Sequence, residues 1–516
     1  MKAIIIARIF FLLSLLSIAT HFIIPSGLYT VTVRQRFKGR PSFTNMTSYT
    51  LDTPVFLESS TVSMHTTPPI EVNLGTAKPY LESSESSEEE QWMKLVNFTD
   101  SMKSTKCEDD FGFGLIRRWS AARRTWCSPS VTCHPIMQAG HGGNGDNLCI
   151  LENTIFDPAS YNDVNNTRKI VLKYRDTVHQ DWPYLHHNSK VLATSCSKVT
   201  SEWKDNQLPG WNLDWMVGGL STDGQVECQS IEEKPLLIIQ RHGFANFYHD
   251  SEDFFNAFLA LLITGLRPDQ VRVLIADLFP WGPFESFWKH LFLDVKTAWE
   301  VRAEPAKCYR KIIIGIYGPA SPLTFIREKS TCFRSPLVRA YGRWAWQSFG
   351  LAPQRSDNGT RLLWMSRKPS VMWPERAYCD DRYFACADWT HLHIRQIGRV
   401  LRNDEEVVKA LAGRGELRVS SSDFNTLPFQ QQVAQVTATD VLAGPHGAGL
   451  THVLFLPDWA CVVELFIDGS QSNIHFTNMA TWRGLRYTGA VMPNPAPAQD
   501  VVRLVMELLF RAPPPG

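Results

Sequence analysis

The sequence predicts an α/β protein, and the clearest indication lies in the C-terminal half. Apolar residues over 433–442 lead into the glycine-rich stretch 443–452, and a second apolar run follows over 460–466. A strand, a glycine-rich turn, a short helix and another strand form the βαβ unit of Rossmann-like domains. We therefore expect a strand over 433–442, a short helix after the turn, and a Rossmann-like domain over 351–516.

A second alternation of strands and helices lies before residue 350. Its predicted strands are three apolar runs, over residues 235–239, 271–277 and 311–316. A helix is expected between the first two, because Asp250 or Ser251 can cap it and apolar residues recur at helical spacing until Gly265. Chains that alternate in this way build parallel sheets. A first Rossmann-like domain is therefore expected over 106–350, facing the second across a cleft.

The glycine-rich stretch has the composition of an anion-binding turn. Gly447 and Gly449 lack a Cβ atom, so the backbone can turn sharply and approach a bulky anion. The N–H groups of these residues and of Ala448 open the next helix, whose positive dipole end favours negative charge. His446 adds a side-chain donor at the same place. The alternative is a tight strand-to-helix turn without a ligand, and spacing alone leaves both interpretations open.

A second group of polar residues lies at the strand-to-helix turn expected near residue 250. His249 and Asp250 belong to this turn, and Asp253 follows in the first turn of the helix. Open α/β sheets bind ligands at the carboxyl ends of their strands, which is where these side chains are expected. The structural alternative is that Asp250 only caps the helix and His249 packs against it.

The N-terminus contains a candidate membrane anchor. Residues 9–33 carry no Asp, Glu, Lys or Arg, and they are long enough to cross a bilayer. We expect a cytoplasmic tail over 1–8, a type II signal-anchor over 9–33, and a disordered stem over 34–105, where Ser, Thr, Pro and Glu predominate. A cleaved signal peptide is the alternative, because residues 17–19 resemble a cleavage site. Basic residues beyond the apolar segment weaken the charge argument for orientation.

Cysteines and glycosylation sequons favour the lumen of the secretory pathway for the rest of the chain. All eleven cysteines follow the apolar segment, and Asn-x-Thr sequons occur at Asn45, Asn97, Asn165 and Asn358. An odd number of cysteines leaves at least one thiol unpaired within the chain. The formal net charge of +1 gives no indication of a nucleic-acid partner.

The glycine-rich stretch also resembles a known family. GPHGAGLTH (residues 444–452), FLPDWA (455–460) and VEL (463–465) are similar to motifs of glycosyltransferase family 61. The resemblance extends over residues 228–266 and 361–490. It implies the GT-B architecture, in which two Rossmann-like domains face a cleft. It also implies inverting transfer of a sugar from a UDP-sugar, which needs no enzyme nucleophile.

The resemblance implies roles for the candidate residues of the C-terminal half. A predicted strand over 361–368 ends near Arg367, whose guanidinium geometry suits a pyrophosphate. Glu464 would accept the ribose hydroxyls of the nucleotide. The residues expected to meet the diphosphate are Arg367, His446, Gly447, Ala448 and Gly449.

The catalytic base is expected from the N-terminal half. His249, Asp250 and Asp253 are the candidates for taking the proton of the acceptor hydroxyl, and the sequence does not choose among them. Family members differ in their need for a divalent metal. No Asp-x-Asp pair lies beside a predicted strand end, and no Cys-x-x-Cys pair occurs. No metal ligand is therefore predicted, and a protein-bound metal is not expected to be essential.

The sugar and the acceptor are less well specified. Residues 482–485 and several positions over 232–266 resemble members that add xylose in β-1,2 linkage to N-glycans, whereas 233–235 and 456–460 resemble members that transfer O-linked N-acetylglucosamine. We expect UDP-xylose as donor, a glycoprotein N-glycan as acceptor, and the Golgi membrane as location. The alternatives are UDP-GlcNAc with a protein acceptor of the EGF-domain or O-mannose type, and a glycan-binding member without activity.

Overall fold

The computed structural model describes residues 88–96, 101–136, 146–159, 191–199, 227–242, 246–277, 281–324, 328–356, 358–368, 399–467 and 469–510. All of them fall within one compact unit, Thr66–Gly516. The predicted tail and anchor, residues 1–33, lie outside the described residues. Within the described ranges, no helix is both long enough and apolar enough to span a bilayer.

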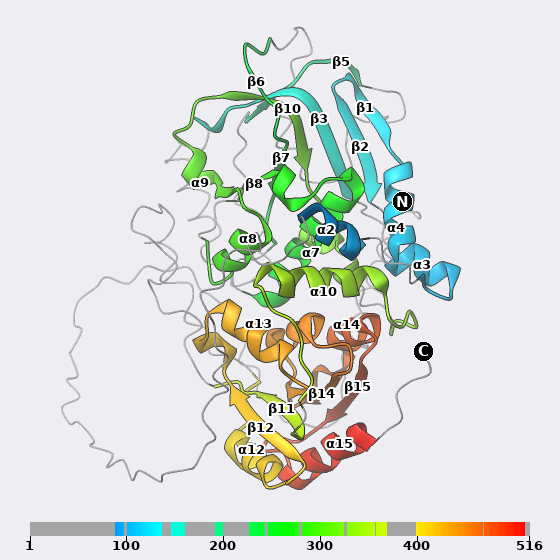
Figure 1. Ribbon diagram of the computed structural model, residues 1–516, viewed down its shortest axis with the longest axis vertical. Helices are drawn as coiled ribbons and strands as arrows, with labels where there is room; N and C mark the ends of the chain where they lie inside the picture. The colour runs from blue at the N-terminus through cyan, green and yellow to red at the C-terminus, as the bar shows by residue number, and fades with distance from the viewer. Residues whose placement is uncertain are drawn as a thin grey trace, which may run out of the picture. The chain divides into compact units, whose positions relative to one another are not determined.

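The first half is built on a mixed sheet of ten strands (Figure 1). Its strands are β1 (Arg124–Pro129), β2 (Val131–Ile136), β3 (Asp146–Phe156), β4 (Leu192–Ala193), β5 (Cys196–Val199), β6 (Ile231–Glu232), β7 (Leu236–Ile239), β8 (Arg272–Ile275), β9 (Val295–Thr297) and β10 (Lys307–Ile314). β10, β7, β8 and β9 are parallel neighbours in that order. β3, β2, β1 and β5 continue the sheet antiparallel beyond β10. The parallel part contains the three predicted strands, and the sequence did not indicate the antiparallel extension.

Helix α7, Phe247–Thr264, connects β7 to β8 and is buried along most of its length. Asn246 caps it by accepting a hydrogen bond from the Tyr248 backbone N–H at 3.2 Å. Gly265 ends it in the left-handed conformation, with φ 68°. The predicted end is therefore confirmed, whereas the predicted cap at Asp250 or Ser251 is wrong. Because Asn246 caps the helix earlier, His249 and Asp250 lie inside its first turn.

The other helices of the first half pack around the sheet and beside α7. They are α2 (Glu88–Val96), α3 (Thr105–Phe111), α4 (Phe113–Ala121), α8 (Glu285–Leu291), α9 (Ala298–Val301) and α10 (Pro336–Ser348), with 3₁₀ turns η2 (Pro268–Gln270), η3 (Gly318–Ala320) and η4 (Pro322–Thr324).

The second half is built on a parallel sheet of five strands in the order β12-β11-β13-β14-β15. The strands are β11 (Thr360–Met365), β12 (Leu417–Ser422), β13 (Val441–Pro445), β14 (Cys461–Phe466) and β15 (Arg486–Val491). The helices are α12 (Asp404–Ala412), α13 (Phe429–Thr437), α14 (His475–Arg483) and α15 (Ala498–Phe510), with 3₁₀ segments η5 (Phe424–Thr426), η6 (Ala448–Phe455) and η7 (Ser470–Ser472). The strand order reverses between β11 and β13, as in doubly wound folds. This half matches the predicted Rossmann-like topology.

One strand boundary in this half differs from the prediction. The strand expected over 433–442 begins only at Val441, and residues 433–437 belong to α13. The apolar side chains of this stretch follow a helical pattern, since Val433, Val436 and Phe429 all face the core. A short apolar run fits a buried helix as well as a strand, which explains the error.

A single hydrophobic core joins the helices of the two halves. It includes Phe254 and Phe258 of α7, Trp344 of α10, Val433 of α13 and Phe455 of η6. Figure 1 shows α10 between the strands of the first sheet and helices α13 and α14. The packing is thus continuous across the predicted domain boundary at residue 350.

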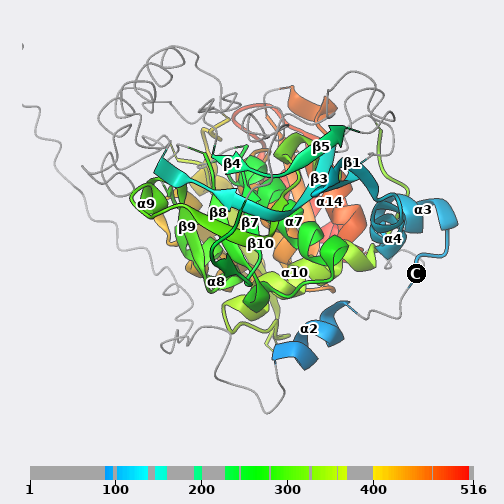
Figure 2. The same cartoon turned by 90° about the horizontal axis from the view of Figure 1, so that it is seen from above.

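Helix α2 corrects the extent of the predicted disordered stem, residues 34–105. The Trp92 ring packs against Phe258 and Trp344, with ring centroids 5.8 and 6.0 Å apart. Trp92 and Leu95 are both buried, and Figure 2 shows α2 on the outer side of α10. The apolar residues of this short segment share one helical face. Residues 88–96 therefore belong to the folded body.

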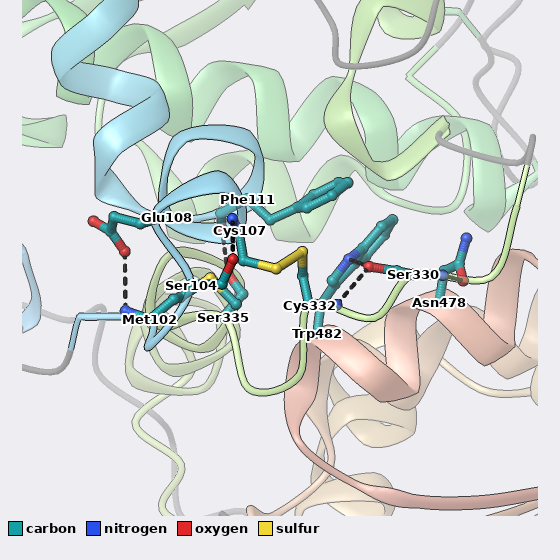
Figure 3. Close-up of a disulfide and its surroundings, with 10 residues drawn as sticks. All are labelled: Met102, Ser104, Cys107, Glu108, Phe111, Ser330, Cys332, Ser335, Asn478 and Trp482. Carbon is teal, nitrogen blue, oxygen red and sulfur yellow. Dashed lines mark hydrogen bonds between the residues drawn. A yellow bond between two sulfur atoms is a disulfide. The ribbon is translucent and has the colours of Figure 1, made fainter.

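Four disulfides stabilise the described part of the chain. They join Cys107 to Cys332, Cys127 to Cys196, Cys133 to Cys149 and Cys228 to Cys308. Cys461 is a free, buried thiol, which agrees with the prediction of at least one unpaired cysteine. Cys379 and Cys386 lie outside the described residues. Figure 3 shows the first disulfide beside Trp482, whose ring stacks on Phe111 at 4.8 Å, so α3 is tied to α14.

Candidate active site

The C-terminal candidate residues meet where the strand order of the second sheet reverses. Arg367 follows the end of β11 by two residues, and His446 follows β13 directly. β11 and β13 are parallel neighbours, so both residues lie at the carboxyl edge of the sheet. This edge is the usual ligand site of open α/β sheets. We call residues 446–449 the glycine turn.

Gly447 brings the Arg367 guanidinium against the glycine turn. A Cβ atom on Gly447 would lie only 1.7 Å from Nη1 of Arg367. The Gly447 φ of 162° is extended backbone open to any residue, so space rather than conformation requires glycine here. Gly449 similarly faces the Met365 side chain. The structure therefore places a positive charge on the turn that the sequence predicted to bind an anion.

Glu464 has surroundings that differ from those of a ribose-binding carboxylate. Its side chain is fully buried, and Oε1 is hydrogen-bonded to Nδ1 of His446. The Tyr487 hydroxyl donates to Oε2 at 2.6 Å. Burial and the neighbouring Glu464 raise the pKa of Tyr487, so the hydroxyl stays protonated. Because both carboxylate oxygens are engaged inside the protein, Glu464 is suited to orient His446 and leave its Nε2 for a ligand.

At the carboxyl edge of the first sheet, a buried ion pair and a backbone-to-carboxylate hydrogen bond hold two residues that follow β7. Arg241, which follows β7, donates to both oxygens of Asp277, and both side chains are almost fully buried. The His242 backbone N–H donates to Oδ2 of Asp253 at 2.7 Å. These contacts fix the positions of Arg241 and His242 after β7. Asp253 therefore positions His242.

His242, His249 and Glu252 form a compact group that we call the histidine cluster. Nδ1 of His242 lies 2.8 Å from Oε2 of Glu252, and Nδ1 of His249 lies 3.4 Å from the same oxygen. Burial raises the pKa of Glu252, but the hydrogen bonds from the two rings outweigh it and lower the pKa below its ordinary value. Glu252 is therefore ionised at neutral pH.

The three predicted base candidates differ sharply in accessibility. Asp250 and Asp253 are each 1% exposed, whereas the His249 side chain is 17% exposed. Burial, followed by the negative charge of Asp250, raises the pKa of Asp253 well above its ordinary value. His249 is therefore the one of the three whose side chain reaches the surface.

His475, the first residue of α14, lies between the histidine cluster and the glycine turn. Its Nδ1 is 2.7 Å from the Tyr248 hydroxyl. Burial lowers the pKa of His475 to about 4, with Glu252 raising it and His446 and His249 lowering it further. The Tyr248 ring lies between His475 and His249, with ring centroids 4.4 and 5.1 Å away. The ring of Phe476 also contacts both His446 and Tyr248.

The structure thus brings together the two predicted groups and adds residues that the sequence analysis missed. His242 follows a predicted strand by three residues, and Glu252 lies in the predicted first turn of a helix, so position could have identified both. Tyr248 and His475 carried no such signal, because their partnership spans 227 residues of sequence.

Comparisons with known proteins agree with this arrangement. Residues 324–463 match the family model Glycosyltransferase 61, a range that contains Arg367 and the glycine turn. The EGF domain-specific O-linked N-acetylglucosamine transferase of Drosophila melanogaster is 25% identical over 272 residues, covering 50% of this chain and 46% of its own. The β-1,2-xylosyltransferase RCN11 of Oryza sativa subsp. japonica is 23% identical over 318 residues, covering 57% and 56%. The Arabidopsis thaliana β-1,2-xylosyltransferase is 24% identical over 295 residues, covering 52% and 53%.

The parallel sheets, the site at the strand-order reversal and these matches agree with the glycosyltransferase class. The match of residues 324–463 to the Glycosyltransferase 61 model confirms the family resemblance predicted from the motifs. The chain spans about half the length of the curated relatives it matches.

Proposed function

We propose that the protein is an inverting glycosyltransferase that transfers a sugar from a UDP-sugar to a glycoprotein. The observation that carries this proposal is the contact of α14 with both groups, since Nδ1 of His475 lies 2.7 Å from the Tyr248 hydroxyl and the Phe476 ring contacts both His446 and Tyr248. A direct displacement needs a stabilised leaving diphosphate and a base on the acceptor hydroxyl. The two groups supply these functions from opposite halves, in a GT-B arrangement.

The glycine turn is the proposed site of the diphosphate. The Arg367 guanidinium, the backbone N–H groups of 447–449 and Nε2 of His446 are donors suited to phosphate oxygens. Glu464 holds His446 through Nδ1, so that Nε2 faces away from the carboxylate. We infer that these donors balance the charge of departing UDP.

His249 is the proposed catalytic base. Its Nδ1 lies beside Glu252, so a proton on Nδ1 leaves Nε2 with a lone pair for the acceptor hydroxyl. Glu252 then stabilises the imidazolium that forms. Asp250 and Asp253 are too deeply buried to meet an acceptor, and their proposed role is to position the turn.

Xylose in β-1,2 linkage to an N-glycan core remains the proposed product, because two matching relatives are named β-1,2-xylosyltransferases. O-linked N-acetylglucosamine transfer to protein is the second candidate. It is favoured by the similarity to EGF domain-specific transferases at 25% identity.

The proposed location is the Golgi membrane, with a type II anchor over residues 9–33 and the catalytic body in the lumen. Four disulfides within the described residues support an oxidising compartment.

A sugar-donor screen tests the proposed function. The full chain is incubated with UDP-xylose, UDP-GlcNAc and UDP-arabinose, and UDP release is measured for each, with His446→Ala as the inactive control. Release from UDP-xylose alone supports xylosyl transfer and directs acceptor tests to trimmed N-glycans. A preference for UDP-GlcNAc supports the second candidate. Failure to bind or turn over any UDP-sugar overturns the proposed function and favours a glycan-binding member without activity.

A further inference from the structure

The histidine cluster directs three ligand-type atoms toward one point. The Nδ1 atoms of His242 and His249 are 3.1 Å apart, closer than their ring centroids, which are 4.3 Å apart at an interplanar angle of 73°. The nitrogen edges therefore face one another, and both lie within 3.4 Å of Oε2 of Glu252. Within the described residues, these three offer ligand atoms that all lie within 4.8 Å of one another.

Two kinds of contact fit this triangle. With a proton on each Nδ1, both rings donate to Oε2 of Glu252. With neither proton present, two ring nitrogens 3.1 Å apart and a carboxylate oxygen are three acceptors around one point, which is the arrangement that one cation satisfies.

We propose that the histidine cluster binds a divalent transition-metal ion of the Zn²⁺ class. Bonds of about 2.0–2.1 Å at tetrahedral angles place ligand atoms about 3.3 Å apart. The three separations of 2.8, 3.1 and 3.4 Å bracket that value. Two imidazoles and one carboxylate suit zinc and leave a fourth position open. His249 is the most exposed of the three side chains, so the open position adjoins it.

The surroundings of the cluster support a cation. Asp250, Glu252 and Asp253 are all 1% exposed within one helical turn, so acidic side chains are concentrated at the cluster. The His242 backbone N–H donates to Asp253 at 2.7 Å, which fixes the position of this proposed ligand in the chain.

The ion and the proposed role of His249 exclude each other. A metal on Nδ1 of a neutral imidazole leaves the proton on Nε2, which then donates a hydrogen bond and accepts no proton. With the ion bound, His249 therefore cannot act as the base, so the proposed role of His249 belongs to the metal-free chain. Metal binding is consequently separable from the proposed function and is measured without activity.

Metal binding to the full chain tests the inference directly. The purified protein is analysed for zinc by mass spectrometry, stripped with a chelator, and titrated with Co²⁺ while visible d–d absorption is recorded. We expect one ion per chain, with tetrahedral Co²⁺ bands that Zn²⁺ abolishes. His242→Gln, His249→Gln and Glu252→Gln should each weaken binding by more than the roughly 10–100-fold typical of residues that only orient ligands. His290→Gln, on α8 and outside the cluster, should leave binding unchanged.

The same samples distinguish failure of the inference from failure of the proposed function. UDP affinity and thermal melting are measured for every variant to establish that each is folded. A folded wild-type chain that binds neither Zn²⁺ nor Co²⁺ stoichiometrically, or whose Co²⁺ bands survive in all three cluster variants, overturns the metal site. Stoichiometric metal binding without UDP binding leaves the metal site standing and removes the proposed function.

Discussion

At the scale of single residues, Gly447 controls the position of the nearest positive charge. An added Cβ would overlap Nη1 of Arg367, the far end of a flexible side chain that can move away. We predict that Gly447→Ala lowers UDP affinity about 10–100-fold, the loss of one charge-assisted hydrogen-bonding group, with little change in stability. Titration calorimetry with UDP measures the effect. Gly415→Ala, where nothing lies within 4 Å, is the matched control. Equal UDP affinity in the two variants would contradict the role of Arg367.

Tyr487 is predicted to hold the carboxylate that orients His446. Tyr487→Phe leaves Oε2 of the fully buried Glu464 without this donor, so we expect a loss of about 1.5–3 kcal/mol in the free energy of unfolding. Urea denaturation provides the measurement. Tyr341→Phe is the control, because the Tyr341 hydroxyl is buried and has no hydrogen-bond partner among the described residues. A similar loss in both variants would assign the effect to the ring environment rather than to Glu464.

His475 makes stability depend on pH in a defined direction. Burial lowers its pKa to about 4 in the folded state, against an ordinary value of about 6.5. Between these values the unfolded state binds the additional proton, so stability rises with pH across this window and falls as the pH approaches 4. We predict that His475→Gln reduces this slope by about 1 kcal/mol per pH unit. Urea denaturation from pH 4.5 to 6 tests it, and an unchanged slope would refute it.

At the scale of elements, α2 shows how a short helix outside the predicted body joins the core. Trp92→Ala should lower the free energy of unfolding by about 3–5 kcal/mol, because the ring is 6% exposed and packs on Phe258 and Trp344. Met93→Ala is the control in the same helix, since Met93 is 43% exposed. Chemical denaturation compares the two. If Trp92→Ala lowered the free energy of unfolding by less than about 1 kcal/mol, α2 would not be part of the folded body.

The boundaries of elements were less predictable than their existence. Gly265 ended α7 as expected, because a left-handed C-cap is a local property of glycine. The start of α7 was misplaced, because Asn246, Asp250 and Ser251 are all competent caps and only the fold selects one. The run over 433–442 was divided between α13 and β13 for a similar reason.

At the scale of the whole molecule, the compartment is testable through the sequons. Asn358 is exposed in the turn before β11, where a glycan fits without disturbing the core. We predict that the chain expressed in eukaryotic cells loses mass on treatment with an N-glycosidase, and that Asn358→Gln lowers this loss by one glycan. Mass spectrometry of intact protein provides the measurement. A chain with no glycan at any sequon would contradict the lumenal location.

The shared core also places the two halves in one cooperative structure. Residues from α7 and α10 of the first half pack with residues from α13 and η6 of the second. The boundary at residue 350 was predicted from a change of sequence pattern. The contacts between the two halves join residues far apart in the chain, so a local sequence pattern could not predict them.

The sequence by itself determined the α/β class, the parallel strands around the glycine turn, and the protein family that the motifs of this turn resemble. These properties depend on hydrophobic period, on glycine and on short motifs, which act over a few residues. It also identified Arg367 and His446 as polar residues after strand ends, and His249 as a polar residue near the start of a helix.

Only the tertiary structure decided how these residues act on one another. It paired Glu464 with His446 through a hydrogen bond and placed Glu252 and His242 beside His249. It also brought His475 into contact with Tyr248, next to the histidine cluster. Each of these pairings depends on burial and on directions fixed by packing between distant elements. A buried carboxylate pairs with whichever group the fold brings within hydrogen-bonding distance. That distance cannot be predicted from the separation of the two residues along the sequence.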